Sequence, residues 1–141
     1  MFDVIIIPYL DRPSCLTYHK CMNNSRRLLG ELGEEASVGY LLEKGYLILA
    51  RNFRTPHGEI DIVAVTGDLL VFVEVKTRSS HVFAYPEESV TLRKQAYMLS
   101  AAEYYLDSAP EKWDTWQFDV IAVETNPKGD LQIDHFENVI G

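Results

Sequence analysis

The most informative part of the chain, residues 58–78, reads GEIDIVAVTGDLLVFVEVKTR. Two runs rich in β-branched and apolar residues, 59–65 and 69–76, flank Thr66-Gly67-Asp68, and this pattern predicts a β-hairpin. Gly67 and Asp68 suit the two central positions of a type II′ turn, in which glycine comes first. A two-residue loop of this kind places Thr66 opposite Leu69 and thereby sets the pairing of the two strands.

The predicted register brings four charged side chains to one face of the hairpin. It places Asp61 opposite Glu74 and Glu59 opposite Lys76, and alternate residues of a strand share a face. The other face is expected to carry the apolar residues Ile60, Ile62, Val73 and Val75. Directly opposed carboxylates repel one another, so a divalent cation between Asp61 and Glu74 is the simplest compensation. The competing interpretation is a solvated sheet face with ordinary alternating charges.

An aspartate followed by Glu-x-Lys on the next strand supplies the parts of a site for phosphate chemistry. A metal ion held by Asp61 and Glu74 would polarise a phosphate and lower the pKa of a bound water. Lys76, on the same face, would orient that water or neutralise charge on the phosphoryl group. We therefore consider a metal-dependent phosphodiesterase as a candidate function.

The sequence before the hairpin predicts one helix and one strand. Residues 25–45 place apolar side chains on a single helical face, and Gly45 is a natural helix end. The face consists of Leu28, Leu29, Leu32, Ala36 and Tyr40. Residues 46–53 are apolar and β-branched enough for a strand, which Pro56 and its neighbours interrupt.

The sequence after the hairpin predicts a second helix and two further strands. Pro86, Glu87 and Glu88 would open this helix, which ends near residues 107–110. Its inward stripe is expected to be Ala96, Leu99, Ala102 and Leu106. Strands are predicted over 116–123 and 131–136, joined by a turn at 126–129. The order of elements indicates a mixed α/β domain over residues 25–141, without internal repeats.

The first 24 residues show no sustained period and contain Pro8, Pro13 and an Asn23-Asn24 pair, so we expect an irregular leader. Met22 is a candidate start of the compact part. Cys15 and Cys21 are expected to be free thiols in a reducing compartment; a zinc site with His19 would lack a fourth ligand. No segment approaches the ~20 apolar residues of a membrane span, and a cytoplasmic location is expected.

The net charge of -8 argues at first against a polyanionic partner, but the charge is unevenly distributed. Residues 101–141 carry nine acidic and two basic residues, and residues 1–100 are almost neutral. Strong nonspecific electrostatic binding to nucleic acid is therefore not expected. A weak or structure-selective enzyme that depends on its metal remains compatible with the composition.

Several motifs in the same order resemble one known family. Gly58-Glu59-Ile60-Asp61 followed by FVEVKTR at 72–78 resembles the signature of the YraN-like family of uncharacterised bacterial proteins. Further matching motifs are Gly30-x-x-Gly33-Glu34, Gly45-Tyr46, Arg51-Asn52, Lys94-Gln95 and Phe118-Asp119-Val120. That family is similar to the restriction-endonuclease-like superfamily with its PD-(D/E)xK active site, which includes archaeal Holliday-junction resolvases. The proline that often precedes the first acid of that motif is replaced by Ile60.

The resemblance implies a three-layer α/β/α fold with a mixed central sheet of about five strands. It implies that Asp61 and Glu74 bind Mg²⁺ or Mn²⁺, that the Val75 carbonyl completes the coordination shell, and that Lys76 is the catalytic lysine. Glu34 would support the metal-bound water. Glu59 would orient Lys76, although a simple cross-strand salt bridge between these two residues is an alternative.

The resemblance also implies a nucleic-acid partner, with DNA as the first candidate, and a homodimer by analogy with the resolvases. Phosphate contacts would come from Arg51, Arg54, Arg78 and Lys94, with His57 and Arg93 nearby in the sequence. The implied activity is that of an endonuclease or exonuclease. Two alternatives stay open: a binding module that keeps the nuclease fold with little or no catalysis, and an interaction protein whose acidic tail docks a basic partner.

Overall fold

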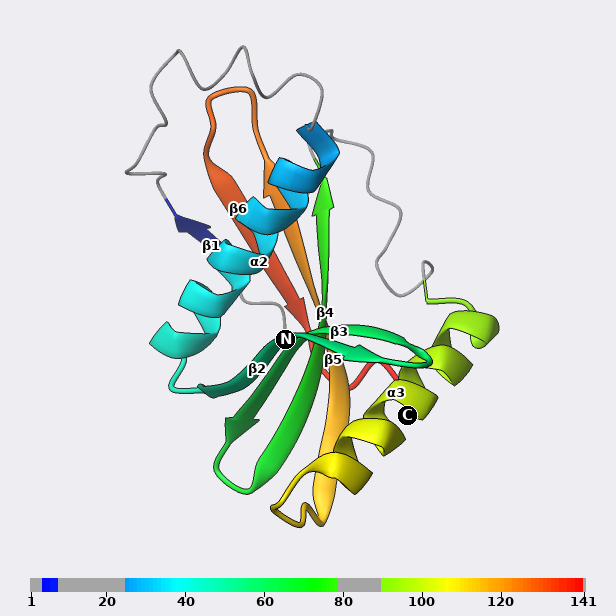
Figure 1. Ribbon diagram of the computed structural model, residues 1–141. Helices are drawn as coiled ribbons and strands as arrows, with labels where there is room; N and C mark the ends of the chain where they lie inside the picture. The colour runs from blue at the N-terminus through cyan, green and yellow to red at the C-terminus, as the bar shows by residue number, and fades with distance from the viewer. Residues whose placement is uncertain (1–3, 8–24, 79–89, 141) are drawn as a thin grey trace.

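The computed structural model describes residues 4–7, 25–78 and 90–140. Across these residues the chain forms six strands and two helices (Figure 1). Their bounds are β1 (Val4–Ile7), α2 (Ser25–Glu43), β2 (Leu47–Thr55), β3 (Gly58–Thr66), β4 (Leu69–Arg78), α3 (Leu92–Ser108), β5 (Thr115–Thr125) and β6 (Leu131–Phe136). The cysteines and Met22 lie outside the described residues.

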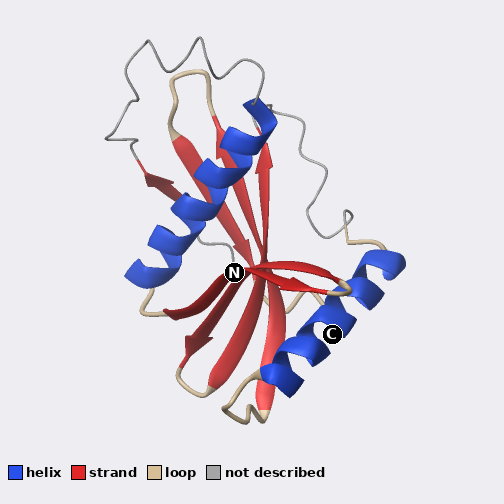
Figure 2. Ribbon diagram, viewed as in Figure 1, coloured by secondary structure: helices blue, strands red, loops and turns tan. Residues whose placement is uncertain are grey.

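The strands form one mixed sheet in the order β1-β6-β5-β4-β3-β2. Only β4 and β5 are parallel among these neighbours. Helix α2 covers one face of the sheet and α3 the other, as Figure 2 shows. The predicted three-layer α/β/α arrangement is therefore confirmed, and the five expected strands are β2 to β6.

Strand β1 is a sixth strand that the sequence analysis missed. Residues 1–24 were expected to be irregular, but Val4–Ile7 pairs antiparallel with Leu131–Asp134 of β6. This short run of Val-Ile-Ile-Ile has high β propensity, and the free edge of β6 gives it a partner. An isolated four-residue run shows no alternating pattern, which is why periodicity alone could not reveal it.

Each helix covers its own hydrophobic core. On the α2 face, Tyr40 and Leu41 pack against Ile62, Val73 and other apolar side chains of the sheet. On the α3 face, Met98 and Tyr105 contact a group of sheet residues that includes Phe72 and Phe118. The sheet is thus buried on both sides in its centre, which explains the nearly continuous apolar runs in β4 and β5.

Helix α3 differs from its prediction at its start and at one residue of the predicted inward face. Its first residue is Leu92, and the Thr91 side chain caps it by accepting a hydrogen bond from the Lys94 N–H. The predicted opening at Pro86–Glu88 lies outside the described residues. The buried stripe is Met98, Ala101, Ala102 and Tyr105, whereas Ala96 is exposed. The other three residues of the predicted stripe do face the core: Ala102 is buried, and Leu99 and Leu106 are partly buried and pack against the same cluster.

The β3–β4 hairpin has the predicted register at its closed end. Thr66 pairs with Leu69, and the pairing continues without slippage to Ile62 and Val73. Gly67 has a φ of 57°, as the first central residue of the predicted turn requires. The regular β3–β4 pairing ends at Ile62 and Val73, so the expected opposition of Asp61 to Glu74 and of Glu59 to Lys76 is not part of it.

From Asp61 back toward the β2–β3 turn, the ribbon of these two strands leaves the plane of the sheet and lies against α3 (Figure 1). Asn52, opposite this point on β2, has a φ of 49°, and the Phe53 and Tyr105 ring centroids are 5.0 Å apart. Ile60 consequently packs in the core under α3, while Ile62 packs under α2. The prediction that both face the same side was wrong because it assumed a flat strand.

A candidate metal centre between the sheet and helix α3

Asp61 lies where β3 parts from β4. One of its carboxylate oxygens accepts a hydrogen bond from the Val75 backbone N–H at 2.8 Å, so the side chain takes the place of a ladder bond. Burial raises the pKa of Asp61 to about 6, and the nearby charges of Glu74, Glu34 and Glu59 act in the same direction. The hydrogen bond from Val75 opposes this rise. A carboxylate held in this way is a good ligand for a cation.

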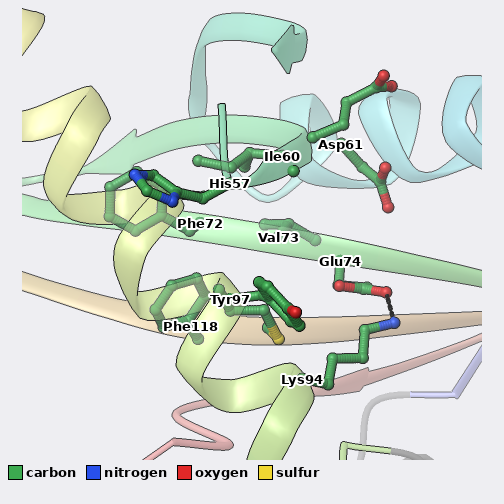
Figure 3. A pocket seen from close by; sticks show the side chains of 13 residues that line it. His57, Ile60, Asp61, Phe72, Val73, Glu74, Lys94, Tyr97 and Phe118 are labelled. Atoms are coloured by element: carbon green, nitrogen blue, oxygen red, sulfur yellow. Dashed lines mark hydrogen bonds and ion pairs between the residues drawn. The ribbon is translucent and has the colours of Figure 1, made fainter. Parts of the chain in front are cut away.

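Glu74 lies on β4 beside Asp61, and both carboxylates point toward the same end of a pocket in Figure 3. The Glu74 side chain is only 18% exposed. Its Oε1 atom lies 3.1 Å from the Lys76 Nζ, and the same atom accepts a hydrogen bond from the Lys94 Nζ. Two ammonium groups from different elements therefore share one carboxylate oxygen.

The two lysines titrate differently because their surroundings differ. Burial lowers the pKa of Lys76, and the neighbouring Lys94 lowers it further, against the attraction of Glu74. Burial also disfavours the charge on Lys94, but its contacts with Glu74 and Lys76 outweigh this and raise its pKa. Lys76 is thus the lysine more easily converted to a neutral amine, which is the property expected of a proton-transferring group.

Helix α2 brings Glu34 toward the carboxylates. At Gly33 the helix lies so close to β4 that a Cβ atom would be 1.8 Å from the Thr77 Oγ1. Glu34 follows directly, and its charge contributes to the raised pKa of Asp61. The sequence analysis placed Glu34 beside the metal from resemblance alone; the close approach at Gly33 is the physical reason it reaches this region.

Glu59 does not have the partner that the hairpin register predicted. It forms an ion pair with Arg54 at 3.6 Å, across the β2–β3 ladder, in which these two residues are paired. Lys76 instead contacts Glu74. The expected contact failed because the ribbon bends at Asp61, which turns Glu59 away from the β4 register.

The four predicted phosphate-binding cations do not gather at one place. Lys94 is at the carboxylates, and Arg54 is on the ribbon next to Glu59. Arg51 bonds Glu35 of α2 at 2.8 Å, and Arg78 is the last residue of β4. For Lys94 the sequence analysis predicted a phosphate contact and missed the bond to Glu74. No spacing in the sequence signals that bond, because α3 approaches β4 only in the folded chain.

A pocket of about 380 Å³ extends from the carboxylates inward between the sheet and α3. Asp61, Glu74 and Lys94 line one end, and the rings of Phe72 and Phe118 line the other (Figure 3). His57, from the β2–β3 turn, and Tyr97, from α3, also contribute to the wall. The candidate centre is therefore the charged end of a larger, partly apolar cavity.

A second polar cluster lies under α2. The fully buried Asp119 accepts hydrogen bonds from the Gln117 side chain (2.8 Å) and the Asn138 N–H (2.9 Å). It also contacts the His135 Nε2 at 2.7 Å, and the His135 Nδ1 lies 3.3 Å from the Tyr40 hydroxyl.

Metal-ligating atoms of Asp119, His135 and Glu137 lie within 4.8 Å of one another, so these three side chains form a possible metal-ligand group. The sequence analysis used Asp119 only as part of the Phe118-Asp119-Val120 motif and did not associate it with His135. The two residues occupy neighbouring strands, where Ile121 pairs with His135, and no motif links them in the sequence.

Neither α2 nor α3 is long and apolar enough to cross a membrane, so the described helices offer no membrane span.

The mixed sheet with one helix on each face defines a three-layer α/β/α protein, and two carboxylates converge at one end of its pocket. A family model described as "Uncharacterised protein family UPF0102" matches residues 33–123, and the chain belongs to this family. The match confirms the resemblance to the YraN-like proteins. All the elements that build the candidate centre, from Glu34 to Lys94, lie inside the matched range.

Three relatives illustrate the similarity, and each bears the name UPF0102 protein. The one from Caldicellulosiruptor saccharolyticus is 45% identical over 107 residues, which cover 76% of this chain and 91% of the relative. The relative from Moorella thermoacetica is 48% identical over 102 residues, covering 72% and 85%. That from Thermodesulfovibrio yellowstonii is 46% identical over 110 residues, covering 78% and 93%.

Proposed function

We propose that this protein is a metal-dependent nuclease that hydrolyses phosphodiester bonds in DNA or another nucleic acid. The observation that carries the proposal is the convergence of Asp61 and Glu74 at the point where β3 and β4 separate, with Lys76 at 3.1 Å from Glu74. Asp61 and Glu74 come from two adjacent strands and line a pocket together with Lys94. A cavity that contains titratable groups with shifted pKa values, here Asp61 and Lys94, is the usual setting of an active site.

The residues fit a hard divalent cation. Both candidate side-chain ligands are carboxylates, the donors that Mg²⁺ and Mn²⁺ prefer. Burial, and then the charges of the neighbouring acids, raise the pKa of Asp61, and a bound cation would stabilise its carboxylate against both effects. When bound, such an ion would polarise the phosphate and supply an activated water. The Val75 carbonyl is a further candidate ligand, because the hydrogen bond from the Val75 N–H to Asp61 shows that the backbone of Val75 lies beside this carboxylate.

The roles of the protein groups follow from their positions. Lys76, whose pKa is lowered, is suited to orient the attacking water and to exchange a proton with it. Lys94 keeps its charge more firmly and would stabilise the negative charge that develops on the phosphoryl oxygens. Glu34 would accept a hydrogen bond from water on the α2 side. The Val75 N–H fixes the Asp61 carboxylate before substrate arrives.

One observation favours a second candidate, a nucleic-acid-binding module with little or no catalysis. The Glu74 carboxylate already has two lysine partners, so its charge is compensated within the protein itself. In such a module, Lys76 and Lys94 would serve only to contact phosphates. The two candidates differ in whether a divalent ion binds at Glu74.

Cleavage assays with variants separate the two candidates. Purified protein is incubated with supercoiled, linear, single-stranded and four-way-junction DNA and with single-stranded RNA, each with Mg²⁺ or Mn²⁺. Cleavage is expected with the wild type and is expected to be lost in Asp61→Ala, Glu74→Ala and Lys76→Ala. Retained cleavage in all three variants would mean that a contaminant is responsible.

Asp68→Asn is the matched control, because Asp68 is an exposed carboxylate at the other end of the same hairpin. It should cleave like the wild type. Nucleic acid that is bound but never cut by any of these proteins would support the binding module. Calorimetric titration with Mn²⁺ adds a readout independent of activity: binding that Glu74→Ala does not weaken would remove the metal from this site.

A further inference from the structure

The pocket beside the candidate centre is larger than a metal ion and a phosphate require. Its volume is about 380 Å³, within the ~300–1,000 Å³ range of sites that hold small organic ligands. Only one end is charged. The remainder is lined by apolar side chains of the sheet and α3, namely Ile60, Phe72, Phe118, Met98 and Ala101.

The apolar end is built from the rigid part of the fold. Phe72 and Phe118 are buried in adjacent strands with ring centroids 5.3 Å apart, and Ala101 on α3 leaves the room that a larger side chain would fill. These side chains belong to the core under α3, so the end of the pocket has a fixed shape. A planar, weakly polar group that enters from the charged end would therefore meet these buried side chains at the inner end of the pocket, next to the exposed ring of Tyr97.

The walls add an exposed aromatic ring and a titratable side chain. Tyr97 on α3 is 49% exposed, and its ring is held by Arg93, whose guanidinium carbon lies 5.8 Å from the ring centroid. His57 enters from the β2–β3 turn. An aromatic face at the wall is the feature that binds unpaired bases by stacking, and a polar edge nearby allows hydrogen bonds.

We propose that this pocket receives one unpaired nucleobase of the substrate, next to the phosphate that lies at Asp61 and Glu74. The inference rests on the proposed function and names its substrate class: strands with an unpaired nucleotide, as in single strands, frayed ends, bulges or mismatches. A base within a duplex has both faces covered by its neighbours and its edge paired, so it must leave the stack to enter. Cleavage should therefore depend on how easily that nucleotide becomes unpaired.

Binding of small probes tests the pocket without any cleavage. Adenosine monophosphate, ribose phosphate and inorganic phosphate are titrated into the protein with Mn²⁺ present, by calorimetry and by NMR shifts of Tyr97 and His57. We expect adenosine monophosphate to bind about 5- to 150-fold more tightly than ribose phosphate, which corresponds to the ~1–3 kcal/mol of stacking one base. Equal affinities for these two probes would overturn the inference.

Two variants and a control locate the effect. Tyr97→Ala should weaken adenosine monophosphate about 5- to 20-fold and leave ribose phosphate unchanged. Tyr104→Ala is the control, since Tyr104 is a similarly exposed tyrosine (43%) of α3 that does not line the pocket. Ala101→Leu would fill the apolar end and should abolish the preference for the nucleotide, provided that its circular dichroism spectrum and melting curve show a folded protein. If Tyr97→Ala and Tyr104→Ala have equal effects, the inference is wrong.

Cleavage of matched oligonucleotides distinguishes this inference from the proposed function. A perfect duplex, the same duplex with one bulged nucleotide and the same duplex with a bulged abasic site are compared. The inference expects the intact bulge to be cut at least tenfold faster than the other two. Equal cleavage of all three would refute the base pocket and leave the nuclease standing. No cleavage of any substrate would refute the nuclease, and the probe titrations would still decide whether a base binds.

Discussion

The carboxylate of Asp61 accepts the backbone N–H of Val75 at 2.8 Å, and this bond marks the point where β3 departs from β4. The Asp61 side chain thus satisfies the Val75 N–H, which a backbone carbonyl of β3 would accept if the two strands stayed paired. The same bond holds the carboxylate in a half-buried position beside Glu74. The candidate centre therefore lies where the pairing of β3 with β4 ends.

Asp61→Asn should stabilise the metal-free protein at neutral pH. The pKa of Asp61 is raised in the folded state from 3.8 to about 6, so the folded protein binds this proton more tightly than the unfolded chain. The contribution of Asp61 to the unfolding free energy therefore falls as pH rises from about 4 to about 6. A shift of about two pKa units corresponds to at most about 3 kcal/mol, and we expect a gain of about 1–2 kcal/mol at pH 7.5.

Urea unfolding in EDTA at several pH values measures this effect. The difference between Asp61→Asn and the wild type should be present at pH 7.5 and vanish near pH 4, where Asp61 is protonated in the folded state. Asp68→Asn, on the exposed turn, should show no such dependence. A difference that is the same at both pH values would contradict the raised pKa.

Gly33→Ala should destabilise the protein because α2 touches β4 at this residue. The added Cβ would lie 1.8 Å from the Thr77 Oγ1 and 2.9 Å from the Thr77 Cβ, so the helix or the strand must move. Overpacking of this kind costs about 1–3 kcal/mol of unfolding free energy. Thermal or urea unfolding gives the value, and adding Thr77→Ala should restore most of it.

Gly30→Ala and Gly39→Ala are controls in the same helix, because nothing lies within 4 Å of the Cβ position at either glycine. Each should stabilise the helix by about 0.5–1 kcal/mol through reduced backbone freedom. If Gly33→Ala behaves like these two, α2 does not press on Thr77 in solution. In that case the route by which Glu34 approaches Asp61 would need another explanation.

The features that could be predicted depend on residues close together in the chain, and those that could not be predicted depend on tertiary contacts. The register from Thr66 to Val73 follows from a two-residue turn, so the sequence was sufficient for it. The bend at Asp61 depends on Asn52 in the neighbouring strand and on the packing of Ile60 against α3, which alternation cannot show. The Asp61–Glu74–Lys76 set was predicted because its members are close in the chain. The Lys94–Glu74 bond and the His135–Asp119 contact depend on tertiary packing and were missed.

Asp119→Asn should destabilise the protein strongly without affecting the candidate metal centre. Asp119 is fully buried, and its carboxylate joins Gln117, Asn138 and His135 in one network under α2. Asparagine replaces one carboxylate oxygen by an NH₂ group, so a buried donor of the network loses its acceptor; each buried group left without a partner costs about 1–3 kcal/mol, and we expect about 2–4 kcal/mol in all. Mn²⁺ binding at Asp61 and Glu74 should be unchanged, because the network contacts neither carboxylate.

Asp134→Asn serves as the control for this variant. Asp134 lies next to His135 in β6 but is partly exposed, and burial raises its pKa, so the neutral residue should be tolerated. Melting curves with EDTA and with Zn²⁺ complete the test. If EDTA lowers the melting temperature of the wild type and Zn²⁺ restores it only while Asp119 and His135 are intact, these residues and Glu137 hold a metal and the network is more than structural.

Lys94→Met should separate metal affinity from catalysis. Lys94 donates to the Glu74 oxygen that a metal ion would also use, and its positive charge repels such an ion. Removing it should raise Mn²⁺ affinity about 3- to 10-fold, since a charge pair at a partly buried site is worth about 1–4 kcal/mol before solvent screening. Cleavage should nevertheless fall about 10²- to 10³-fold, because the phosphoryl group loses a cation in the transition state.

Lys76→Met, which removes the other partner of Glu74, should also tighten Mn²⁺ binding and lower cleavage. The pH profile distinguishes the two lysines: the limb in which activity rises as Lys76 loses its proton should shift to higher pH in Lys94→Met, because Lys94 helps to lower the pKa of Lys76, and should disappear from the residual activity of Lys76→Met. Mn²⁺ affinity that falls in Lys94→Met would show that Lys94 supports the carboxylate geometry and does not compete with the ion.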